Sequence, residues 1–308
     1  PDATILGQSL YAGGHLTHGY KVSFSGKLYH SESYCLNQKT GRRNYDAIQN
    51  IATKVKPKAI ICGFSAYPRE IDFVAFKKIA QTVGAVLIAD IAHIAGLVAT
   101  GFHPSPVGVA DIITSTTHKT LRGPRSGIIM TDSEELSKNI NKAVFPNLQG
   151  GPLEHIIAAK AVAFKEAKKP EFKQYIQNVL NNMQVFASTL SHFDFNLVTG
   201  GTDNHLALVD LRSKNLTGKD FEEALGQAGI TVNKNAVPAD PNPPKIASGI
   251  RVGTAALTSR GMGVAEMQRI AELFNLVAEN IGNPKILSEI KTEVKSMTSA
   301  FPVPGINK

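Results

Sequence analysis

Residues 85–90 read AVLIAD, and with KAIICGF at residues 58–64 they decide how the first half of the chain folds. Each is a short apolar run with the length of a buried strand, and residues 72–83 between them have helical periodicity. Two further strands are predicted at residues 111–117 and 126–131, joined by a polar turn that contains glycine. This alternation predicts an α/β domain with a largely parallel sheet, in which ligands bind beyond the carboxyl ends of the strands.

The second half of the chain has a different pattern. Helical periodicity covers residues 152–167 and 171–190, and a Lys-Lys-Pro break separates the two stretches. This break predicts a boundary between a domain at residues 1–169 and a smaller α+β domain at residues 170–308. The elements predicted for the smaller domain are strands at 196–198, 205–211, 230–232 and 250–252, a helix capped near Thr217, and helices that begin near Val264 and Pro284.

Composition narrows the class of protein. The chain has 308 residues, of which 43% are hydrophobic and 19% charged, so it can bury a sizeable core. Its net charge is +8, but the basic residues are scattered, which disfavours nucleic acid as a partner. Two cysteines, Cys35 and Cys62, lack CxxC spacing and favour a reducing, cytoplasmic compartment. No run of about 18 apolar residues could cross a bilayer, so a membrane partner is not expected.

A lysine stands among hydroxyl groups in STTHKTLRGPRSG, residues 115–127, directly after a predicted strand. Taken alone, Lys119 would be an ordinary exposed lysine in a turn. A lysine that acts as an amine nucleophile must lose its proton near neutral pH, and burial or nearby positive charge promotes that loss. His118, Arg122 and Arg125 could supply the charge, so Lys119 is a candidate nucleophile.

Asp90 ends the strand that runs into ADIAHIAGL, residues 89–97. A carboxylate in this place is either a helix cap or a partner for a cationic group. A pyridoxal phosphate enzyme requires such an acid, because it keeps the pyridine nitrogen protonated and so makes the ring an electron sink. His93 could instead join Asp90 as a metal ligand, but no third ligand has supporting spacing, so no metal is expected. Asp90 and Lys119 together favour pyridoxal phosphate.

Three further motifs are weak on their own. GGHLTHG at residues 13–19 has glycines that let the backbone approach a ligand; His15 could lie on an aromatic ring, whereas His18 is expected to hold loop backbone. QGGP at residues 149–152 offers N–H groups suited to a phosphate, or forms a plain turn. Arg251, on a predicted strand, can hold a carboxylate in a bidentate fork or form a surface ion pair.

These motifs, with GFSAYPR, NLTGKD and ITVNKN, occur in the order found in serine hydroxymethyltransferases, and the sequence resembles that family over essentially its whole length. The match is specific, because TTHKTLRGPR and SGIRVGT are not shared by other pyridoxal phosphate enzymes of the same fold. The resemblance implies the aspartate aminotransferase-like fold (fold type I), with an incomplete large domain and a C-terminal α+β small domain. It also implies that an N-terminal segment of family members is missing, so this chain is expected to bind the cofactor weakly and to have little or no activity.

The resemblance implies a role for each matched residue. Lys119 would carry pyridoxal phosphate as an internal Schiff base, Asp90 would pair with the pyridine nitrogen, and Arg251 would hold the amino-acid carboxylate. The other cofactor-site residues would be His15 stacked on the ring, Ser65 and His93 at its phenolic oxygen, Thr116, His118 and Arg125 around the lysine, and Gly150 and Gly151 at the phosphate of a neighbouring subunit. The residues implied to line the folate site are Leu10, Gly14, Leu16, Asn235, Pro243, Pro244 and Lys245.

The implied reaction is the interconversion of serine and glycine with transfer of the one-carbon unit to tetrahydrofolate. It would take place in a homodimer or larger assembly with shared active sites. Two alternatives stay open: cleavage of threonine without folate, and a non-catalytic interaction module that keeps the fold. Folate dependence separates the two enzymes, and retention of the matched cofactor positions argues against the module.

Overall fold

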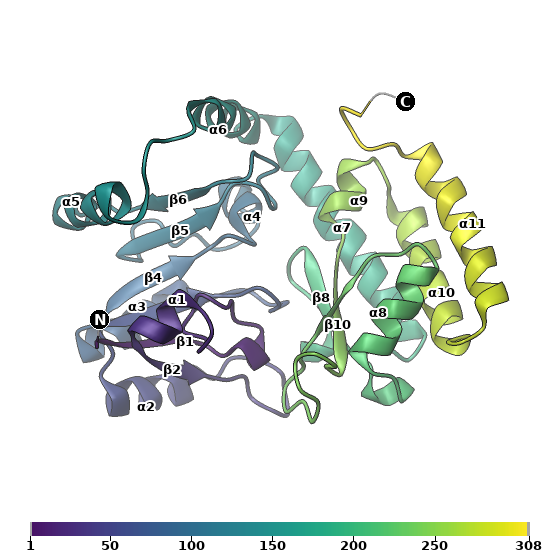
Figure 1. Cartoon of the computed structure of the whole chain (residues 1–308), viewed down its shortest axis with the longest axis horizontal. Coiled ribbons are helices and arrows are strands. Elements are labelled where there is room, and N and C mark those ends of the chain that lie inside the picture. The colour runs from purple at the N-terminus through teal and green to yellow at the C-terminus, as the bar shows by residue number, and fades with distance from the viewer. Residues whose placement is uncertain (1, 307–308) are drawn as a thin grey trace.

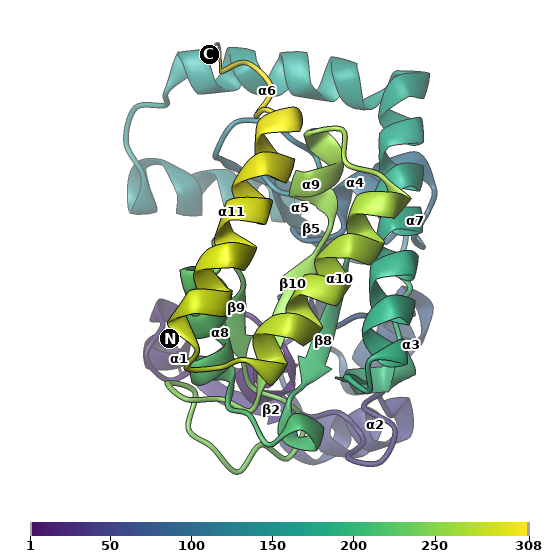
Figure 2. The same cartoon turned by 90° about the vertical axis from the view of Figure 1, so that its right-hand side faces the viewer.

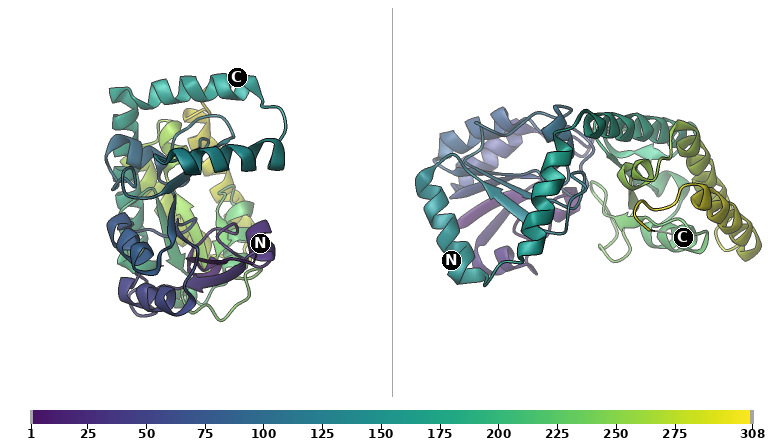
Figure 3. Two further views of the ribbon diagram at one scale, coloured as in Figure 1. Left: turned by 90° about the vertical axis from the view of Figure 1, so that its left-hand side faces the viewer. Right: turned by 90° about the horizontal axis from the view of Figure 1, so that it is seen from above.

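The structure is a computed structural model that describes residues 2–306 of the chain. It consists of two lobes, each built around one β-sheet, and a long helix connects them (Figure 1). Seen from above, the six-stranded sheet and its helices form one lobe, and the four-stranded sheet with the C-terminal helices forms the other (Figure 3).

The first sheet has the strand order β2-β1-β3-β4-β5-β6, and every neighbouring pair is parallel except β5 and β6. Its strands are β1 (Thr4–Gln8), β2 (His30–Tyr34), β3 (Ala59–Gly63), β4 (Val86–Asp90), β5 (Ile112–Thr116) and β6 (Gly127–Met130). The predicted α/β class with a largely parallel sheet is therefore confirmed. Strands β1 and β2 are not among the predicted elements; β2 reads HSESY and has no apolar period, and only its last residue is buried.

Helices cover this sheet. They are α1 (Phe24–Leu28), α2 (Tyr45–Val55), α3 (Phe73–Val83), α4 (Ala95–Thr100), α5 (Glu134–Lys142) and α6 (Glu154–Ala167), with a 3-10 turn at Leu10–Ala12 and a π-helical segment at Ala143–Leu148. Asp72 begins α3 as its N-cap by accepting a hydrogen bond from the Ala75 N–H. Phe73, Phe76, Ile79 and Ala80 then form the buried face that packs on the sheet.

The second sheet has the order β7-β8-β10-β9 and is antiparallel throughout. Its strands are β7 (Asn196–Leu197), β8 (Leu206–Asp210), β9 (Asn233–Asn235) and β10 (Gly249–Gly253). The strand predicted at residues 230–232 is wrong by three positions: Ile230 and Val232 pack against the core of this lobe, while the ladder begins at Asn233. The alternation of Ile230 and Val232 therefore reflects packing against the core and not pairing with a neighbouring strand.

Four helices complete the second lobe, namely α8 (Gly218–Gln227), α9 (Ala255–Ser259), α10 (Val264–Glu279) and α11 (Pro284–Ala300). The predicted cap at Thr217 is confirmed, since its side chain accepts from the Asp220 N–H. Figure 2 shows α10 and α11 side by side in front of this sheet. Within residues 2–306, none of the helices is long and apolar enough to pass through a membrane.

Helix α7 (Pro170–His192) belongs to both lobes. Its first half, up to Val179, packs in the core of the six-stranded sheet, and its second half, from Met183, packs in the core of the four-stranded sheet. The predicted domain boundary at residues 169/170 falls at the first residue of this helix, where Pro170 occupies the first turn.

A polar junction holds the two lobes together. Arg69, just after β3, forms an ion pair with Asp203 at 2.5 Å and donates to the Thr199 carbonyl at 2.7 Å. Asn204 Nδ2 donates to the Tyr67 carbonyl at 3.1 Å, and the Asp203 N–H donates to the Pro68 carbonyl. These bonds fix the segment before β8 against the segment after β3, and so define the edge at which the candidate site lies.

Candidate functional site

The candidate site lies where the carboxyl ends of β3, β4 and β5 face the second lobe. Gly63 pairs with Asp90, and Asp90 with Thr114, so the three strands end at one edge of the sheet. Arg251 on β10 reaches across to this edge: its Nη1 donates to the Ser65 carbonyl at 2.6 Å, and its Nε donates to Asn233 at 3.1 Å. Arg251 is therefore a partly buried link between the lobes and not a surface ion pair.

Asp90 forms a pair with a histidine that the sequence assigns to backbone support. His18 Nδ1 accepts from the His15 N–H at 3.3 Å, so its proton is on Nε2, which donates to Asp90 Oδ2 at 3.0 Å. The other carboxylate oxygen accepts from the Ala92 N–H. Burial raises the pKa of Asp90, but the hydrogen bonds from His18 and Ala92 outweigh it and hold the pKa below its usual value. Asp90 is not a helix cap, because α4 begins five residues later.

Lys119 is half-buried in the turn between β5 and β6, and its Nζ donates to Thr116 Oγ1 at 3.2 Å. Burial lowers the pKa of Lys119; the charge of Asp90 opposes this, and Arg251 and Arg125 lower the pKa further. Of the three predicted cationic neighbours, Arg125 alone contributes to this shift. The guanidinium of Arg122 lies over the Tyr175 ring, 4.0 Å from its centroid.

The GGHLTHG loop is folded tightly against this edge. Gly13 has φ +88°, and both the Ser65 and Ala66 N–H groups donate to its carbonyl. A side chain at Gly14 would place its Cβ 2.0 Å from the Gln8 carbonyl oxygen, so only glycine fits this close approach. The ring of His15 follows directly. Burial, His18 and Lys119 lower the pKa of His15 despite the opposing charge of Asp90, which favours a neutral ring.

Two buried polar atoms at this edge lack a partner among the described residues: Ser65 Oγ and His118 Nδ1. The other nitrogen of the His118 ring lies 3.1 Å from Arg125 Nη1. Buried polar groups in proteins are nearly always hydrogen-bonded, so unpaired ones beside a lysine and a carboxylate indicate a polar ligand that would bind there. The Ser65 hydroxyl, the His118 ring and the Lys119 amine can all donate hydrogen bonds, so together they suit an oxygen-bearing anion.

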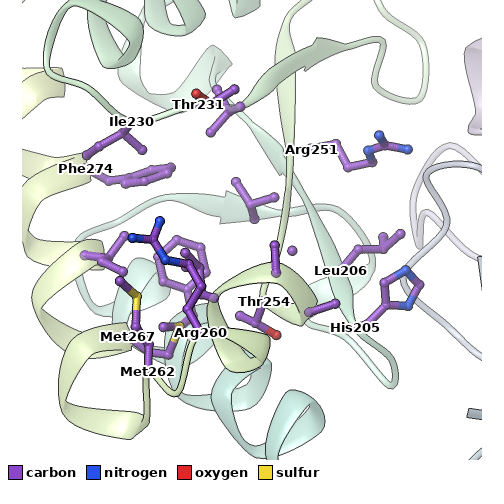
Figure 4. A pocket seen from close by; sticks show the side chains of 18 of the residues that line it. His205, Leu206, Ile230, Thr231, Arg251, Thr254, Arg260, Met262, Met267 and Phe274 are labelled. Carbon is purple, nitrogen blue, oxygen red and sulfur yellow. The ribbon is translucent and has the colours of Figure 1, made fainter. Parts of the chain in front are cut away.

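His205 belongs to this site and was not predicted. It lies just before β8, and its Nε2 is 3.4 Å from His93 Nδ1, with the two rings stacked at an interplanar angle of 22°. A cavity of about 620 Å³ in the second lobe begins at His205 and Arg251 and extends to Phe274 and Met267 (Figure 4). A single histidine without a surrounding motif does not indicate a site in the sequence. In the structure, the preceding Asn204 holds this segment through its hydrogen bond to the Tyr67 carbonyl.

The structure does not bring every predicted residue into this cluster. Gly150 and Gly151 lie in an exposed loop before α6. Leu10 lies in the 3-10 turn before the GGHLTHG loop, and Leu16 is exposed within that loop. Asn235 ends β9 and donates to the Ala236 carbonyl. Pro243, Pro244 and Lys245 are exposed in the loop that follows. No hydrogen bond or ion pair given for residues 2–306 joins that loop to Lys119 or Asp90.

The loop between β9 and β10 is organised by one carboxylate. Asp240 accepts from the N–H groups of Val237, Asn242 and Ser248, and from the Ser248 hydroxyl at 2.6 Å. Burial raises the pKa of Asp240, but these donors outweigh it and lower the pKa overall. The loop that presents Pro243, Pro244 and Lys245 thus has a defined shape.

An Asp240→Asn variant should lose about 1–3 kcal/mol of unfolding free energy at neutral pH, because an amide cannot accept from all four donors. Because the pKa of Asp240 is lower in the folded chain than in the unfolded chain, Asp240 stabilises the fold fully above its unfolded pKa of about 4. This contribution to the unfolding free energy is lost as pH falls through the folded pKa. Urea unfolding at neutral pH and at about pH 3 measures both effects. Equal stability of variant and parent at neutral pH would contradict the assignment; Asp194→Asn, on an exposed turn, is the matched control.

The sequence of the chain is similar to those of known proteins along nearly its whole length. The serine hydroxymethyltransferase family model matches residues 1–274. The serine hydroxymethyltransferase of Legionella pneumophila (strain Lens) is 53% identical over 304 residues, which cover 98% of this chain and 73% of that protein. The serine hydroxymethyltransferase of Methanospirillum hungatei JF-1 is 54% identical over 303 residues, with the same coverage of both chains. The similarity therefore extends over both lobes.

Proposed function

Because the chain belongs to the serine hydroxymethyltransferase family, we propose that it is a pyridoxal phosphate enzyme that interconverts serine and glycine and transfers the one-carbon unit to tetrahydrofolate. The observation that carries the proposal is that Lys119 and Asp90 lie at the same edge of the first sheet. Asp90 ends β4, β4 pairs with β5, and Lys119 follows β5 with its Nζ donating to Thr116 Oγ1 at the end of that strand. The charge of Asp90 raises the pKa of the lysine, and His18 donates to Asp90 Oδ2.

The residues present fit pyridoxal phosphate. Lys119 offers an amine with a lowered pKa, and Asp90 offers a buried, ionised carboxylate. Ser65 Oγ and His118 Nδ1 have no partner within the described chain and are available to ligand oxygens. His15, Ser65, His93, Thr116, His118 and Arg125 would complete the site around the ring and the lysine, and Gly150 and Gly151 would serve the phosphate of a neighbouring subunit.

The chain's own residues then define the chemistry. Bound pyridoxal phosphate supplies an aromatic ring that accepts the electron pair released at Cα of the substrate. Lys119 is the attachment point, because burial and nearby arginines favour its neutral amine. Asp90 would hold a proton at the pyridine nitrogen, and Arg251 would bind the substrate carboxylate with the guanidinium that otherwise donates to the Ser65 carbonyl. Thr116 Oγ1 orients the lysine amine by accepting from it.

The two lobes correspond to the aspartate aminotransferase-like arrangement in this proposal. The six-stranded sheet would be the incomplete large domain at residues 1–169, and the four-stranded sheet the small α+β domain at residues 170–308. Tetrahydrofolate would bind between them, against Leu10, Gly14 and Leu16 on one side and Asn235 with Pro243, Pro244 and Lys245 on the other. A cytoplasmic location is supported by two free cysteines, Cys35 and Cys62.

A homodimer is the proposed assembly, and an exposed apolar surface supports it. Strand β6 and helices α5 and α6 lie at one side of the first lobe (Figure 1). The large apolar side chains exposed on or next to these elements are Ile129, Met130, Phe145, Leu148, Leu153, Ile157, Val162 and Phe164. An accumulation of exposed apolar side chains on neighbouring elements supports an interface there, and in the proposed dimer Gly150 and Gly151 would serve the phosphate of the partner's site.

An Ile157→Asp variant should shift the protein from dimer to monomer, because a charge would be buried in the proposed interface. Ile157 is 49% exposed in the single chain, so the substitution should leave the fold of the subunit intact. Analytical ultracentrifugation measures the assembly, and Val74→Asp, at a similarly exposed valine on α3, is the control. A dimer that survives Ile157→Asp would exclude this surface.

The proposed function is tested by serine cleavage with added pyridoxal phosphate, with and without tetrahydrofolate, in a full-length family member that contains this chain, because the chain spans 73% of the length of its Legionella relative. Formation of glycine that depends on tetrahydrofolate is the expected result. Cleavage of threonine without folate, and no stimulation by tetrahydrofolate, would favour the retro-aldol enzyme. Absence of both reactions in a chain that is folded and binds the cofactor would favour the non-catalytic module.

A further inference from the structure

His205 is a histidine without an assigned role, and it is in contact with His93 of the candidate site. It is 6% exposed, and its Nδ1 has no hydrogen-bond partner anywhere in the described part of the chain. Its Nε2 lies 3.4 Å from His93 Nδ1, and the ring centroids are 5.7 Å apart. Figure 4 shows the imidazole at the end of the cavity, on the same side as Arg251.

The backbone around His205 allows the ring little freedom. The Leu206 N–H donates to Asn204 Oδ1, Asn204 Nδ2 donates to the Tyr67 carbonyl, and the Thr254 N–H donates to the His205 carbonyl. These bonds tie both lobes to the residue, so the Nε2 edge is directed at His93 by tertiary structure rather than by a flexible loop. His93 is itself held, because its carbonyl accepts from Thr120 Oγ1 at 2.9 Å.

The unpaired nitrogen decides which of the two rings donates. Burial lowers the pKa of His205 to about 3 and lowers the pKa of His93 well below its usual value, with Arg251 adding to both shifts, so both rings are neutral. If His93 donated from Nδ1, the single proton of His205 would sit on its buried Nδ1, which would leave an N–H donor unpaired. If His205 donates from Nε2, its Nδ1 is only an unfilled acceptor, the less costly arrangement.

We propose that His205 is a positioning residue that donates from Nε2 to His93 Nδ1 and so fixes His93 as the tautomer protonated on Nε2. His93 then presents an N–H, not a lone pair, to the site. If the proposed function holds, this N–H donates to the phenolic oxygen of the cofactor ring. The ligand's identity rests on the proposed function, whereas the tautomer of His93 does not, because it follows from the protein alone.

The chain without cofactor tests the tautomer directly. In chain labelled with ¹⁵N on its imidazoles, NMR should find both His93 and His205 protonated on Nε2, with signals assigned by their loss in His93→Asn and His205→Gln. His205→Phe keeps the stacked ring but removes the donor, so both tautomers of His93 should be populated. His205→Gln places an amide N–H where Nε2 lies and should restore one tautomer; His205→Asn is too short and should resemble the phenylalanine variant.

A proton on His93 Nδ1 in the parent chain, or a single unchanged tautomer in His205→Phe, would overturn the proposal. His192→Gln is the control: His192 is exposed at the end of α7, so its loss should not change the His93 signals. Thermal unfolding of each variant identifies any variant that does not fold. If His205→Phe does not fold, the comparison of His205→Gln with His205→Asn still tests the proposal.

The loaded enzyme gives a second readout. His205→Phe should lower kcat for serine cleavage on the order of 10-fold, with little change in KM, as loss of a partner behind a functional histidine does at metal sites. It should also change the absorption band of the bound cofactor, and His205→Gln should recover both. If the full-length protein that contains this chain neither binds pyridoxal phosphate nor cleaves serine, the proposed function fails, while the NMR result still decides the role of His205. An unchanged kcat and band in a loaded His205→Phe enzyme would refute the positioning role.

Discussion

Lys119→Ala will abolish covalent attachment of pyridoxal phosphate and reduce serine cleavage by on the order of 10³-fold or more, in the range lost when a nucleophile is removed. The reason is that Lys119 supplies a half-buried amine with a lowered pKa at this edge of the sheet. Absorption spectroscopy of chain mixed with pyridoxal phosphate, followed by denaturation, shows whether the cofactor is covalently held.

Two comparisons make this result decisive. Lys219→Ala removes an exposed lysine of α8 in the second lobe and should leave the absorption band and the rate unchanged. Lys119→Arg keeps a positive charge but not an amine, and should behave like the alanine variant. An absorption band that persists unaltered in Lys119→Ala would assign cofactor attachment to a different lysine and would remove the basis of the proposed function.

Asp90→Asn is expected to lower the rate by about 10²- to 10³-fold, as the loss of one preorganised electrostatic group does in other active sites. An amide in place of the carboxylate keeps the size and a hydrogen bond but loses the negative charge, so it cannot hold a proton at the pyridine nitrogen. The folded pKa of Asp90 is below its usual value, so the parent carboxylate is ionised throughout the neutral range.

The pH dependence separates this electrostatic role from a packing role. Asp90 stabilises the folded chain fully above its unfolded pKa of about 4, and that contribution is lost as pH falls through its lowered folded pKa. Asp90→Asn should therefore have a flatter dependence of unfolding free energy on acid pH. Its bound cofactor should also lose its spectral response to substrate at neutral pH. His18→Asn, which removes the Nε2 donor but not the carboxylate, should reproduce only part of the loss; a fully active Asp90→Asn enzyme would contradict both effects.

The strands that carry the site were predictable because their signal is local. In β3 and β4, five-residue apolar runs end at Gly63 and at Asp90, and burial of such runs on both faces of a parallel sheet requires little else. Thr217 likewise identified the start of α8 through a cap that lies within residues 217–220. Local chemistry also identified Lys119, since hydroxyls and a strand end surround it in the sequence.

The pairings within the site were not predictable, because they join residues that are far apart in the sequence. His18 and Asp90 are 72 positions apart, and Arg251 lies 186 positions from the Ser65 carbonyl to which it donates. Neither motif indicates its partner: the same histidine could hold backbone, and the same arginine could bind a surface carboxylate. The polar strand β2 was missed because HSESY has no apolar period and only its last residue is buried.

The amino-acid sequence by itself determined the α/β class, the buried strands and the residue types that pyridoxal phosphate chemistry needs, because hydrophobic periodicity and short motifs act over a few neighbouring positions. Only the tertiary structure decided which ring donates to Asp90, which arginines lower the pKa of Lys119, and that His205 lies against His93. Those properties depend on burial and on distances of a few ångströms across two lobes, and such distances exist only once the chain has folded.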